Sequence, residues 1–430
     1  LGLIVMDEEQ ENSYKSESTP KYHARETALE VAKLYGASVV LGSATPSLEA
    51  YYRAGRGEYR LFQLTKRLTG GELPTVYTVD LRQELQEGNR SIFSRKLQEL
   101  MTDRLNKGQQ TILFLNRRGY AGFVSCRSCG EVMKCPHCDV SLSEHKGGRL
   151  ICHYCGYTQP MPKLCPKCGS KYILGFKAGT QQIEEKLKEL YPGVRTLRMD
   201  ADTTRTKDSY EKILSSFANG EADVLIGTQM IVKGHDFPKV TLVGILAADL
   251  SLNASDYRAG ERTFQLLTQA VGRAGRGALP GEAVIQTYQP DHYAITCAAA
   301  QDYESFYQEE ILYRELSGYP PVAHMLAVQI YGKEEENVKQ LALRLTDVVK
   351  SNMDFLSGKQ KEQSNKKIQV LGPAPANISK INDIYRYVFY VKHAEYDVLV
   401  EVKDRLEETL RQWQPRQMSI QFDFDPVSVL

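Results

Sequence analysis

Four closely spaced pairs of cysteines constrain this chain more than any other feature of its sequence. Each pair has the form Cys-x-x-Cys, and the pairs are Cys126/Cys129, Cys135/Cys138, Cys152/Cys155 and Cys165/Cys168. Each pair places two thiolates on one tight turn, which is half of a tetrahedral zinc site. Four halves make two sites, so we expect two structural Zn²⁺ ions. Because sulfur occupies all four positions around each ion, these sites should organise structure and not perform chemistry.

Clustered cysteines in a chain of 430 residues favour metal over disulfides, and hence a reducing, cytoplasmic location. A disulfide knot is the alternative interpretation. Three histidines lie near the pairs, but eight cysteines already satisfy two ions, so we interpret these histidines as supporting or surface groups; they are His137, His145 and His153. Cys297 stands apart and is interpreted as an ordinary buried thiol.

How the four cysteine turns combine is less certain than their number. Sequential pairing would join the first two turns across residues 130–134 alone, which is a tight loop. Nested pairing would join the two inner turns across a plausible hairpin, Asp139–Ile151, and would close the two outer turns around it. We favour nesting, and an interleaved arrangement stays possible.

Charge and the first residues of the chain exclude several classes of protein. The formal net charge is +1, so no global basic field exists and any nucleic-acid contact must use local patches. The apolar segment Leu1–Met6 is far too short to span a bilayer, and no signal peptide is recognisable. The chain begins without methionine, inside what is expected to be a strand, so we expect a fragment whose N-terminal part is missing.

The order of expected helices and strands predicts an α/β protein with a different domain at the end. Strand Leu1–Met6, helix Arg25–Tyr35 and strand Ser38–Leu41 start an α/β pattern that runs as far as helix Arg262–Val271 and beyond. After residue 319 the order becomes βαββαβ, which fits a ferredoxin-like α+β domain. The expected units are part of one lobe at 1–54, a linker at 55–92, a second lobe at 93–125 and 170–318, a zinc-binding insertion at 126–169, and the C-terminal domain at 319–430.

An acidic segment, Asp7-Glu8-Glu9-Gln10, follows the first apolar strand. In open α/β sheets, ligands bind at the carboxyl ends of the strands. Two adjacent carboxylates can divide the work there, because one can hold Mg²⁺ while the other accepts a proton from the attacking water. The alternative is a solvated acidic loop, since acidic runs after strands are common.

The phosphate-binding sequence that an NTPase needs, G-x-x-x-x-G-K-[ST], is absent from this chain. The Gly-Lys steps are Gly332-Lys333 and Gly358-Lys359, and neither has Ser or Thr next or a glycine at the required distance before it. This absence agrees with an N-terminal truncation. We therefore expect the chain alone not to hydrolyse ATP at a useful rate.

Five segments come in the order of superfamily 2 helicase motifs. They are Asp7–Gln10, Gly42–Ser47 (Gly-Ser-Ala-Thr-Pro-Ser), Phe114–Tyr120, Gly227–Phe237 and Gln269–Gly277. With the cysteines inserted in the second lobe, the chain closely resembles the bacterial primosomal replication-restart helicases over essentially its whole length. The resemblance implies part of one RecA-like lobe, a complete second RecA-like lobe that carries the two-zinc insertion, and nested zinc ligands.

The resemblance also implies roles for individual residues. Asp7 and Glu8 would be the Mg²⁺ carboxylate and the hydrolytic base, and Arg273 and Arg276 would reach the γ-phosphate, which suits a planar and permanently charged guanidinium. Further positions near the nucleotide would be Gln10, Gly42, Gly234, Asp236 and Gln269. Positions near DNA would be Thr45, Tyr14, Tyr22 and Thr228. The segment Ser43-Ala44-Thr45 would couple the nucleotide state to the grip on DNA.

Two parts of this comparison leave alternatives open. The family usually has His where this chain has Gln10, and only His can become cationic near neutral pH, so the coupling role of that position is in doubt. Tyr14 and Tyr22 follow in a polar loop where the family has an aromatic-bearing loop that senses DNA. Their rings can stack on bases, or they can pack on the surface of the lobe.

The function that the resemblance implies is an ATP-dependent 3′–5′ DNA helicase that recognises stalled or branched replication forks and restarts replication by assembling the primosome. It implies ATP and Mg²⁺ in the intact protein, a monomer, no membrane contact, and as partners branched and single-stranded DNA, single-strand-binding protein and other primosome proteins. One alternative is a zinc-containing nucleic-acid-binding scaffold with a degenerate motor, and another is a translocase or nuclease subunit. Glu8, Arg273 and Arg276 speak against a degenerate motor.

Overall fold

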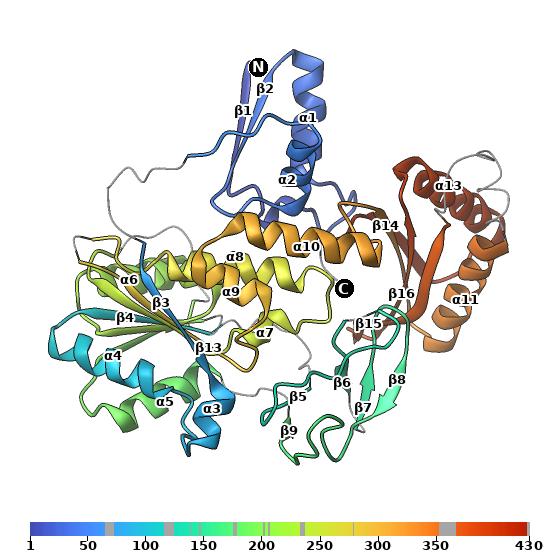
Figure 1. Ribbon diagram of the computed structural model, residues 1–430. Helices are drawn as coiled ribbons and strands as arrows, with labels where there is room; N and C mark the ends of the chain where they lie inside the picture. The colour runs from blue at the N-terminus through green and yellow to red at the C-terminus, as the bar shows by residue number, and fades with distance from the viewer. Residues whose placement is uncertain are drawn as a thin grey trace.

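The computed structural model describes residues 1–64, 73–115, 124–138, 140–145, 148–174, 179–200, 203–204, 207–232, 237–277, 279–351 and 367–427. Figure 1 shows an N-terminal unit that sits over an α/β lobe, with a zinc module and a C-terminal domain beside that lobe. Among the described residues, no helix is both long and apolar enough to cross a membrane.

The N-terminal unit contains two strands and two helices. They are β1 (Leu3–Asp7), α1 (Ala24–Tyr35), β2 (Ser38–Gly42) and α2 (Leu48–Gly55), with a short 3-10 turn at Asn12–Tyr14. The two strands pair in parallel and place Asp7 opposite Gly42. Leu3, Val5 and Val40 expose about half of their surface or more, at 54%, 62% and 49%. Parallel sheets are normally covered on both faces. The face of the β1–β2 sheet that carries these three side chains is exposed instead, unlike the faces of the larger parallel sheet described next.

The α/β lobe is built on a six-stranded parallel sheet. Its strands are β3 (Thr75–Asp80), β4 (Gln110–Phe114), β10 (Thr196–Met199), β11 (Val224–Gly227), β12 (Val240–Ile245) and β13 (Glu282–Thr287). Its helices are α3 (Leu81–Gln86), α4 (Arg95–Asn106), α5 (Thr180–Leu190), α6 (Lys207–Ala218), α7 (Asp249–Leu252), α8 (Ala259–Val271), α9 (Tyr293–Ala300) and α10 (Tyr303–Ser317), with a 3-10 turn at Gln229–Val232. The strand order is β10-β11-β4-β12-β13-β3.

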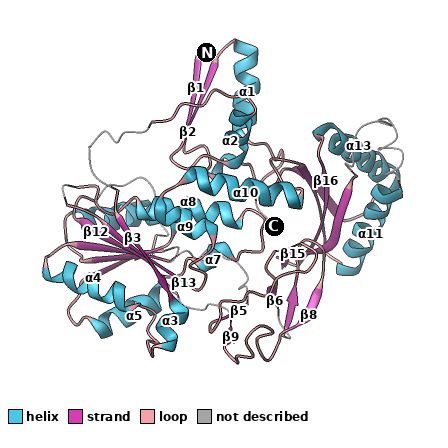
Figure 2. Ribbon diagram, in the orientation of Figure 1, coloured by secondary structure: helices cyan, strands magenta, loops and turns pink. Residues whose placement is uncertain are grey.

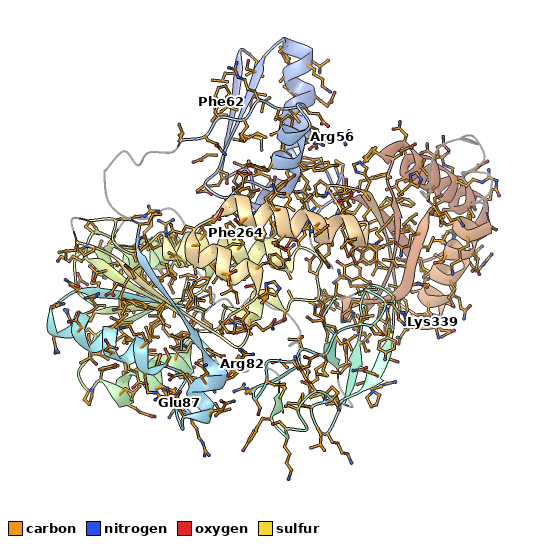
Figure 3. All side chains as sticks on the ribbon, viewed as in Figure 1. Arg56, Phe62, Arg82, Glu87, Phe264 and Lys339 are labelled. Carbon is orange, nitrogen blue, oxygen red and sulfur yellow. The ribbon has the colours of Figure 1, made fainter. Side chains whose placement is uncertain are left out.

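Helices cover both faces of this sheet, as the α/β pattern predicts. Every residue of β11 and β12 is buried, because these central strands lie between two apolar cores. One core includes α8, and Phe264 on that helix is fully buried and stacks on Phe306, with ring centroids 4.2 Å apart (Figure 3). Leu48, the first residue of α2, is buried in the same core, so the N-terminal unit is anchored in the lobe.

One part of the lobe lies where the sequence predicts a linker. Strand β3 pairs in parallel with β13 as an edge strand, and α3 follows it directly, so residues 75–86 belong to the lobe and not to a linker over 55–92. The strand sequence, Thr-Val-Tyr-Thr-Val-Asp, has no regular alternation of polar and apolar residues, and none of its six residues is fully buried. Because the strand is short, lacks the alternating pattern and is followed by charged residues, its sequence resembles a linker.

The zinc module is a small β structure. Its strands are β5 (Ser125–Cys126), β6 (Ser143–His145), β7 (Arg149–Ile151), β8 (Thr158–Pro160) and β9 (Ile173–Leu174). Strands β6, β7 and β8 form an antiparallel sheet, and β5 pairs with β9, which brings the start and the end of the insertion together. The module therefore leaves and re-enters the lobe at one place.

The C-terminal domain confirms the ferredoxin-like prediction. Its elements are β14 (His324–Gly332), α11 (Glu335–Ser351), β15 (Gln369–Ile381), β16 (Ile384–His393), α13 (Tyr396–Trp413) and β17 (Met418–Phe424). The sheet is antiparallel in the order β15-β16-β14-β17, and α11 and α13 cover one face (Figure 2). The other face shares a core with the zinc module, where the rings of Tyr390 and Tyr154 lie 5.0 Å apart.

Candidate functional site

The acidic segment begins at the carboxyl end of β1. Asp7 and Glu8 are both exposed there. The backbone of Glu8 has a φ of 48°, in the left-handed region, and its N–H donates to Asp7 Oδ1 at 3.0 Å. A residue other than glycine in this region stores backbone strain, and such strain is frequent at functional sites. The two carboxylates that the sequence pattern indicates are therefore accessible to solvent, and the backbone turns sharply at Glu8.

Gln10 joins the acidic segment to the Ser-Ala-Thr segment. The hydroxyl of Ser43 donates to Gln10 Oε1 at 2.6 Å, and Gln10 Nε2 donates to Glu8 Oε2 at 2.5 Å. Ser43 Oγ also accepts from the backbone N–H of Thr45 at 2.9 Å. Both segments follow paired parallel strands, so their meeting is a consequence of the sheet register. Thr45 itself is buried, with 1% of its surface exposed.

Glu9 is buried beside the two exposed carboxylates and holds the start of α2. Its two carboxylate oxygens accept from Ser47, one from the backbone N–H at 2.6 Å and one from the hydroxyl at 2.9 Å. Arg25 on α1 donates to Glu9 Oε2 at 3.0 Å and to Ser47 Oγ at 2.8 Å. The sequence pattern alone predicts no separate role for Glu9 or Arg25. The signal that could have found them is a third carboxylate and an isolated arginine on an otherwise apolar helix face.

The arginine segment follows α8 in the other lobe. Arg273 is partly buried and Arg276 is exposed, with Arg276 Nε donating to the carbonyl of Gly272 at 2.9 Å. Gly275 has a φ of +71°, and a Cβ atom at this position would lie 2.4 Å from the backbone nitrogen of Gly281. Only glycine fits such a turn. The segment is thus held in a compact turn against the lobe.

The acidic pair and the arginine pair lie on different units, and contacts that join these units involve α2, α8 and α10. The backbone N–H of Leu48 donates to Glu261 Oε1 at 3.0 Å. Gln269 is partly exposed on α8, and Thr228 is partly exposed at the end of β11. Gly42 ends β2 directly beside Asp7. The remaining expected nucleotide positions, Gly234 and Asp236, lie outside the described residues.

The two tyrosines after the acidic segment differ in their surroundings. The hydroxyl of Tyr14 donates to the backbone carbonyl of Asp7 at 2.8 Å, so this ring packs against the acidic segment. Tyr22 leaves 53% of its surface exposed. Between them, Lys15 forms a buried ion pair with Asp423 of β17 at 2.8 Å, which ties this loop to the C-terminal domain. A cavity of about 850 Å³ opens between the loop, α2, α8 and that domain.

The eight paired cysteines form two separate clusters of four. Cys126, Cys129, Cys165 and Cys168 form the outer cluster, and Cys135, Cys138, Cys152 and Cys155 form the inner cluster. The sulfur atoms within each cluster all lie within 4.8 Å of one another. This arrangement confirms the nested pairing. All nine cysteines of the chain are free thiols, which excludes the disulfide alternative.

The geometry of both clusters fits zinc. Three sulfur pairs across the turns, Cys126/Cys168, Cys129/Cys165 and Cys135/Cys155, are separated by 3.6, 3.6 and 3.5 Å. A tetrahedral site with zinc–sulfur bonds of about 2.3 Å requires sulfur atoms about 3.8 Å apart. In three of the four turns a glycine N–H donates back to the first cysteine's carbonyl, at 2.8 to 2.9 Å. The two clusters can therefore hold two structural Zn²⁺ ions.

The three neighbouring histidines are not members of either cluster. His145 and His153 contact each other through their Nε2 atoms at 3.1 Å, and His153 Nδ1 lies 3.1 Å from the carbonyl oxygen of Pro375. Burial lowers the pKa of both rings. His137 packs edge-on against Tyr157. These contacts agree with the expected supporting roles.

Comparison with known proteins identifies several regions of the chain. Residues 315–427 match the primosomal protein N C-terminal domain, residues 135–160 match the PriA DNA helicase Cys-rich region, and residues 164–278 match the helicase conserved C-terminal domain. A solved structure, Saccharomyces cerevisiae Dbp5 bound to RNA and ADP BeF3, is similar over 74% of this chain and 63% of its own, at 12% identity and a TM-score of 0.36, which is too low to support a conclusion.

Relatives named replication restart protein PriA match the whole chain. The protein of Bacillus subtilis is 45% identical over 100% of this chain and 52% of its own length, and that of Synechocystis is 42% identical over 100% and 51%. The chain thus spans about half the length of the curated relatives it matches. The order of the three matched regions agrees with the two cysteine clusters and the ferredoxin-like domain. The chain belongs to the PriA family of replication restart proteins.

Proposed function

We propose that the full-length protein is an ATP-dependent DNA helicase that unwinds branched DNA with 3′–5′ polarity and restarts replication at stalled forks by assembling the primosome. The observation that carries the proposal is the meeting of two segments at one sheet edge. Gln10 is hydrogen-bonded to Ser43 at 2.6 Å and to Glu8 at 2.5 Å, next to the exposed carboxylate of Asp7. The names of the relatives support the assignment to replication restart.

In this proposal the acidic segment handles the metal and the attacking water. Asp7 would hold Mg²⁺, which neutralises charge on the phosphates when it is bound. Glu8 would accept the proton of the attacking water, and the hydrogen bond from Gln10 orients its carboxylate. Arg273 and Arg276 would neutralise the charge that develops on the γ-phosphate. Gln10, Gly42, Gly234, Asp236 and Gln269 would surround the nucleotide.

Contacts with DNA would come from the loop that follows the acidic segment and from the second lobe. Tyr22 is the exposed ring of that loop and can stack on a base. Thr228 would approach the DNA backbone from the end of β11. Tyr14 and Thr45 are held by their own unit, so their expected effect on DNA binding is indirect.

The zinc module would contact DNA near the point of strand separation or bind proteins of the primosome, including single-strand-binding protein. Exposed basic side chains on it support this role; they are Arg149, Lys163, Lys167 and Lys171. A further basic residue of the module, Lys146, lies outside the described residues. The protein would act as a monomer in the cytoplasm. Because the chain lacks a phosphate-binding loop, these 430 residues alone would not hydrolyse ATP.

A fork-unwinding assay tests the proposal on the full-length protein, meaning this chain with whatever its reading frame encodes before it. We expect unwinding of forks with a 3′ single-stranded tail, and loss of roughly a hundredfold in ATP turnover in Glu8→Gln with fork binding retained. The matched control is Glu30→Gln, which removes an exposed carboxylate of α1 that pairs only with Lys33 among the described contacts. A wild-type protein that binds forks without turning over ATP would favour the scaffold with a degenerate motor.

A further inference from the structure

Five charged side chains form a buried cluster where the N-terminal unit meets α8. They are Glu49, Arg258, Glu261, Glu310 and Arg314, and we call them the charged junction. The proposed mechanism assigns none of them a role. They come from α2, from the start of α8 and from α10. Burying charges is costly, and apolar residues of similar volume often hold a contact equally well, so the presence of charge here requires a reason beyond stability.

Each carboxylate oxygen of Glu261 has its own partner. Oε1 accepts the backbone N–H of Leu48 at 3.0 Å, and Oε2 accepts from Arg314 at 3.0 Å. Leu48 follows Ser47, whose backbone and hydroxyl are held by Glu9 of the acidic segment. Glu261 thereby fixes the start of α2 from one lobe while Glu9 fixes it from the other.

Arg258 makes a second connection across the same boundary. Its Nη2 lies 2.6 Å from Glu49 Oε1 on α2, and its Nη1 lies 3.6 Å from Glu261 Oε2. Burial opposes ionisation of Glu49, but the charges of Arg258 and Arg25 outweigh that effect and lower its pKa. Gly260 lies between Arg258 and Glu261, and a Cβ atom there would lie 2.5 Å from Glu310 Oε2. A glycine at this position therefore leaves room for the side chain from α10.

The junction continues into the zinc module through two tyrosines. Arg258 Nε donates to the hydroxyl of Tyr257 at 2.9 Å. The backbone N–H of Tyr257 donates to the hydroxyl oxygen of Tyr154 at 3.3 Å. Tyr154 is fully buried and lies between Cys152 and Cys155, two ligands of the inner cluster. Hydrogen bonds, the Arg258–Glu261 ion pair and short stretches of backbone therefore link the acidic segment to a cysteine turn.

Helix α8 connects this set of contacts to the arginine segment. The charged junction holds its first turn, and its last residue, Val271, leads directly into Gly272 and Arg273. Thirteen residues of helix form a rod about 20 Å long. A shift of the first turn relative to α2 would therefore move the arginine segment relative to the acidic segment.

We propose that Glu261 and Arg258 are positioning residues that set the arginine segment against the acidic segment, and that Tyr154 and Tyr257 make this setting depend on the zinc module. The inference rests on the proposed ATPase function, because its consequence is a change in turnover. It deepens that function by giving the module a physical connection to the nucleotide motifs. Neither hydrogen-bonded tyrosine is a zinc ligand.

Hydrogen exchange in the full-length protein tests the connection without any need for activity. Tyr154→Phe removes the hydroxyl that bonds Tyr257 and keeps the ring. The matched control is Tyr157→Phe, because the Tyr157 hydroxyl bonds Gln159 within the module at 3.1 Å. We expect exchange of the Leu48 amide to accelerate by roughly threefold or more in Tyr154→Phe only. Equal Leu48 exchange in the two variants, each with two zinc ions bound, would overturn the connection.

Steady-state turnover tests the consequence. In Tyr154→Phe we expect DNA-stimulated kcat to fall by about threefold to tenfold while KM for ATP changes by less than about twofold, with turnover in the absence of DNA unchanged. In Glu261→Gln, which puts an amide against Arg314, the fall in kcat should exceed about tenfold. A purely structural role would lower the amount of active protein in both conditions alike, so a proportional loss with and without DNA contradicts the proposal.

The two experiments separate the two ideas. If the wild-type full-length protein turns over no ATP, the proposed function fails, and exchange at Leu48 still decides whether the connection exists. If wild type is active and Tyr154→Phe equals Tyr157→Phe in both measurements, the connection fails and the helicase assignment stands. If Glu261→Gln does not fold, Tyr154→Phe alone decides, because it removes a single hydroxyl.

Discussion

The zinc module and the charged junction both join parts of the chain that are distant in sequence, but different interactions hold them. The module packs its buried tyrosine and valine side chains on the C-terminal sheet, and its two clusters of sulfur atoms brace it from within. The charged junction joins α2 to α8 and α10 through carboxylates and guanidiniums that each expose 15% or less of their side chain. The first contact is broad and apolar, and the second depends on the direction of individual hydrogen bonds.

The two kinds of contact do different things: apolar burial stabilises the association of two parts, whereas directed hydrogen bonds and ion pairs fix their relative position. Apolar burial contributes roughly in proportion to area and tolerates small shifts. A buried ion pair contributes little net free energy, yet removing one of its members costs about 3–5 kcal/mol because an uncompensated charge remains. The module should therefore respond mainly to loss of metal, and the junction to the loss of any single partner.

The largest effect should follow removal of the inner cluster. The double variant Cys135→Ser and Cys155→Ser leaves two sulfur ligands where four are needed, and structural zinc is worth on the order of 10 kcal/mol of apparent binding free energy. We expect one bound zinc instead of two, together with a large drop in melting temperature, since the C-terminal sheet loses its cover. Metal analysis and thermal unfolding measure both quantities.

A control cysteine lies outside the clusters. Cys297→Ser changes a buried thiol of α9 and should keep two zinc ions per chain. Loss of zinc in this control, or retention of two ions in the double variant, would contradict the assignment of ligands.

The next largest effect should come from the charged junction. Arg314 is fully buried and donates to Glu310, to Glu261 and to the carbonyl of Pro320, at 2.8, 3.0 and 2.7 Å. Arg314→Met removes the guanidinium that pairs with two buried carboxylates, Glu261 and Glu310, so the free energy of unfolding should fall by about 3–5 kcal/mol. Denaturant unfolding measures the change.

An exposed arginine gives the contrast. The guanidinium carbon of Arg344 lies 4.1 Å from the centre of the Trp413 ring on the surface of the C-terminal domain. Arg344→Met should cost less than about 1 kcal/mol, as exposed cation–π contacts do. Equal losses in the two variants would show that burial of the junction carries no special cost.

The sequence predicts features built from neighbouring residues better than contacts between residues that are far apart along the chain. Each cysteine turn is local, so spacing alone predicts the ligands and the two sites, and the order of helices and strands predicts the ferredoxin-like domain. The shared core of Tyr154 and Tyr390 joins positions far apart in sequence, and no local pattern indicates it. Predicting this contact requires the arrangement of whole domains.

The sequence pattern indicates the proposed nucleotide motifs but not the residues that hold them in place. The helix predicted over Arg262–Val271 begins at Ala259 in the structure, so Glu261 lay outside the predicted helix. The first turn contains a glycine and charged residues, which weaken an amphipathic pattern, although these charges face the interior. Glu9 likewise resembles a solvated carboxylate until the position of Ser47 is known.

A smaller effect distinguishes the N-terminal unit from the C-terminal domain by the pH dependence of their stability. His23 caps α1 by accepting the N–H of Arg25 on Nδ1 at 3.2 Å, and burial together with the Arg25 charge lowers its pKa to about 4. The unfolded chain binds this proton near pH 6.5 and the folded chain does not, so stability is present above that pH and is lost as pH falls toward 4. Between pH 7 and 5 we expect a loss of about 1–2 kcal/mol that His23→Asn removes.

His324 in the C-terminal domain should behave in the opposite way. Burial opposes its charged form, but the hydrogen bond with Asp425 at 2.8 Å and the charge of that carboxylate outweigh burial and raise its pKa. Its contribution is present below pH 6.5 and is lost as pH rises through the folded-state pKa, and it should amount to less than about 1 kcal/mol. The free energies of unfolding of the wild-type protein and of His324→Asn, measured at pH 6 and pH 8, give this contribution. If His324 stabilised the fold more at pH 8 than at pH 6, as His23 is expected to do, this assignment would be wrong.

The smallest effect concerns the residue that joins the acidic segment to the Ser-Ala-Thr segment. Gln10 accepts from Ser43 and donates to Glu8, and an imidazole can also do both with its two ring nitrogens. In the full-length protein, Gln10→His should therefore change DNA-dependent ATP turnover by less than about tenfold. Gln10→Ala, which removes both hydrogen bonds and leaves the Ser43 hydroxyl without this acceptor, should cost more than Gln10→His. A change of roughly a hundredfold in ATP turnover of Gln10→His would mean that the charge of this residue matters more than its hydrogen bonds. The contacts between Glu9 and Ser47 would then be the part of the site that depends on geometry alone.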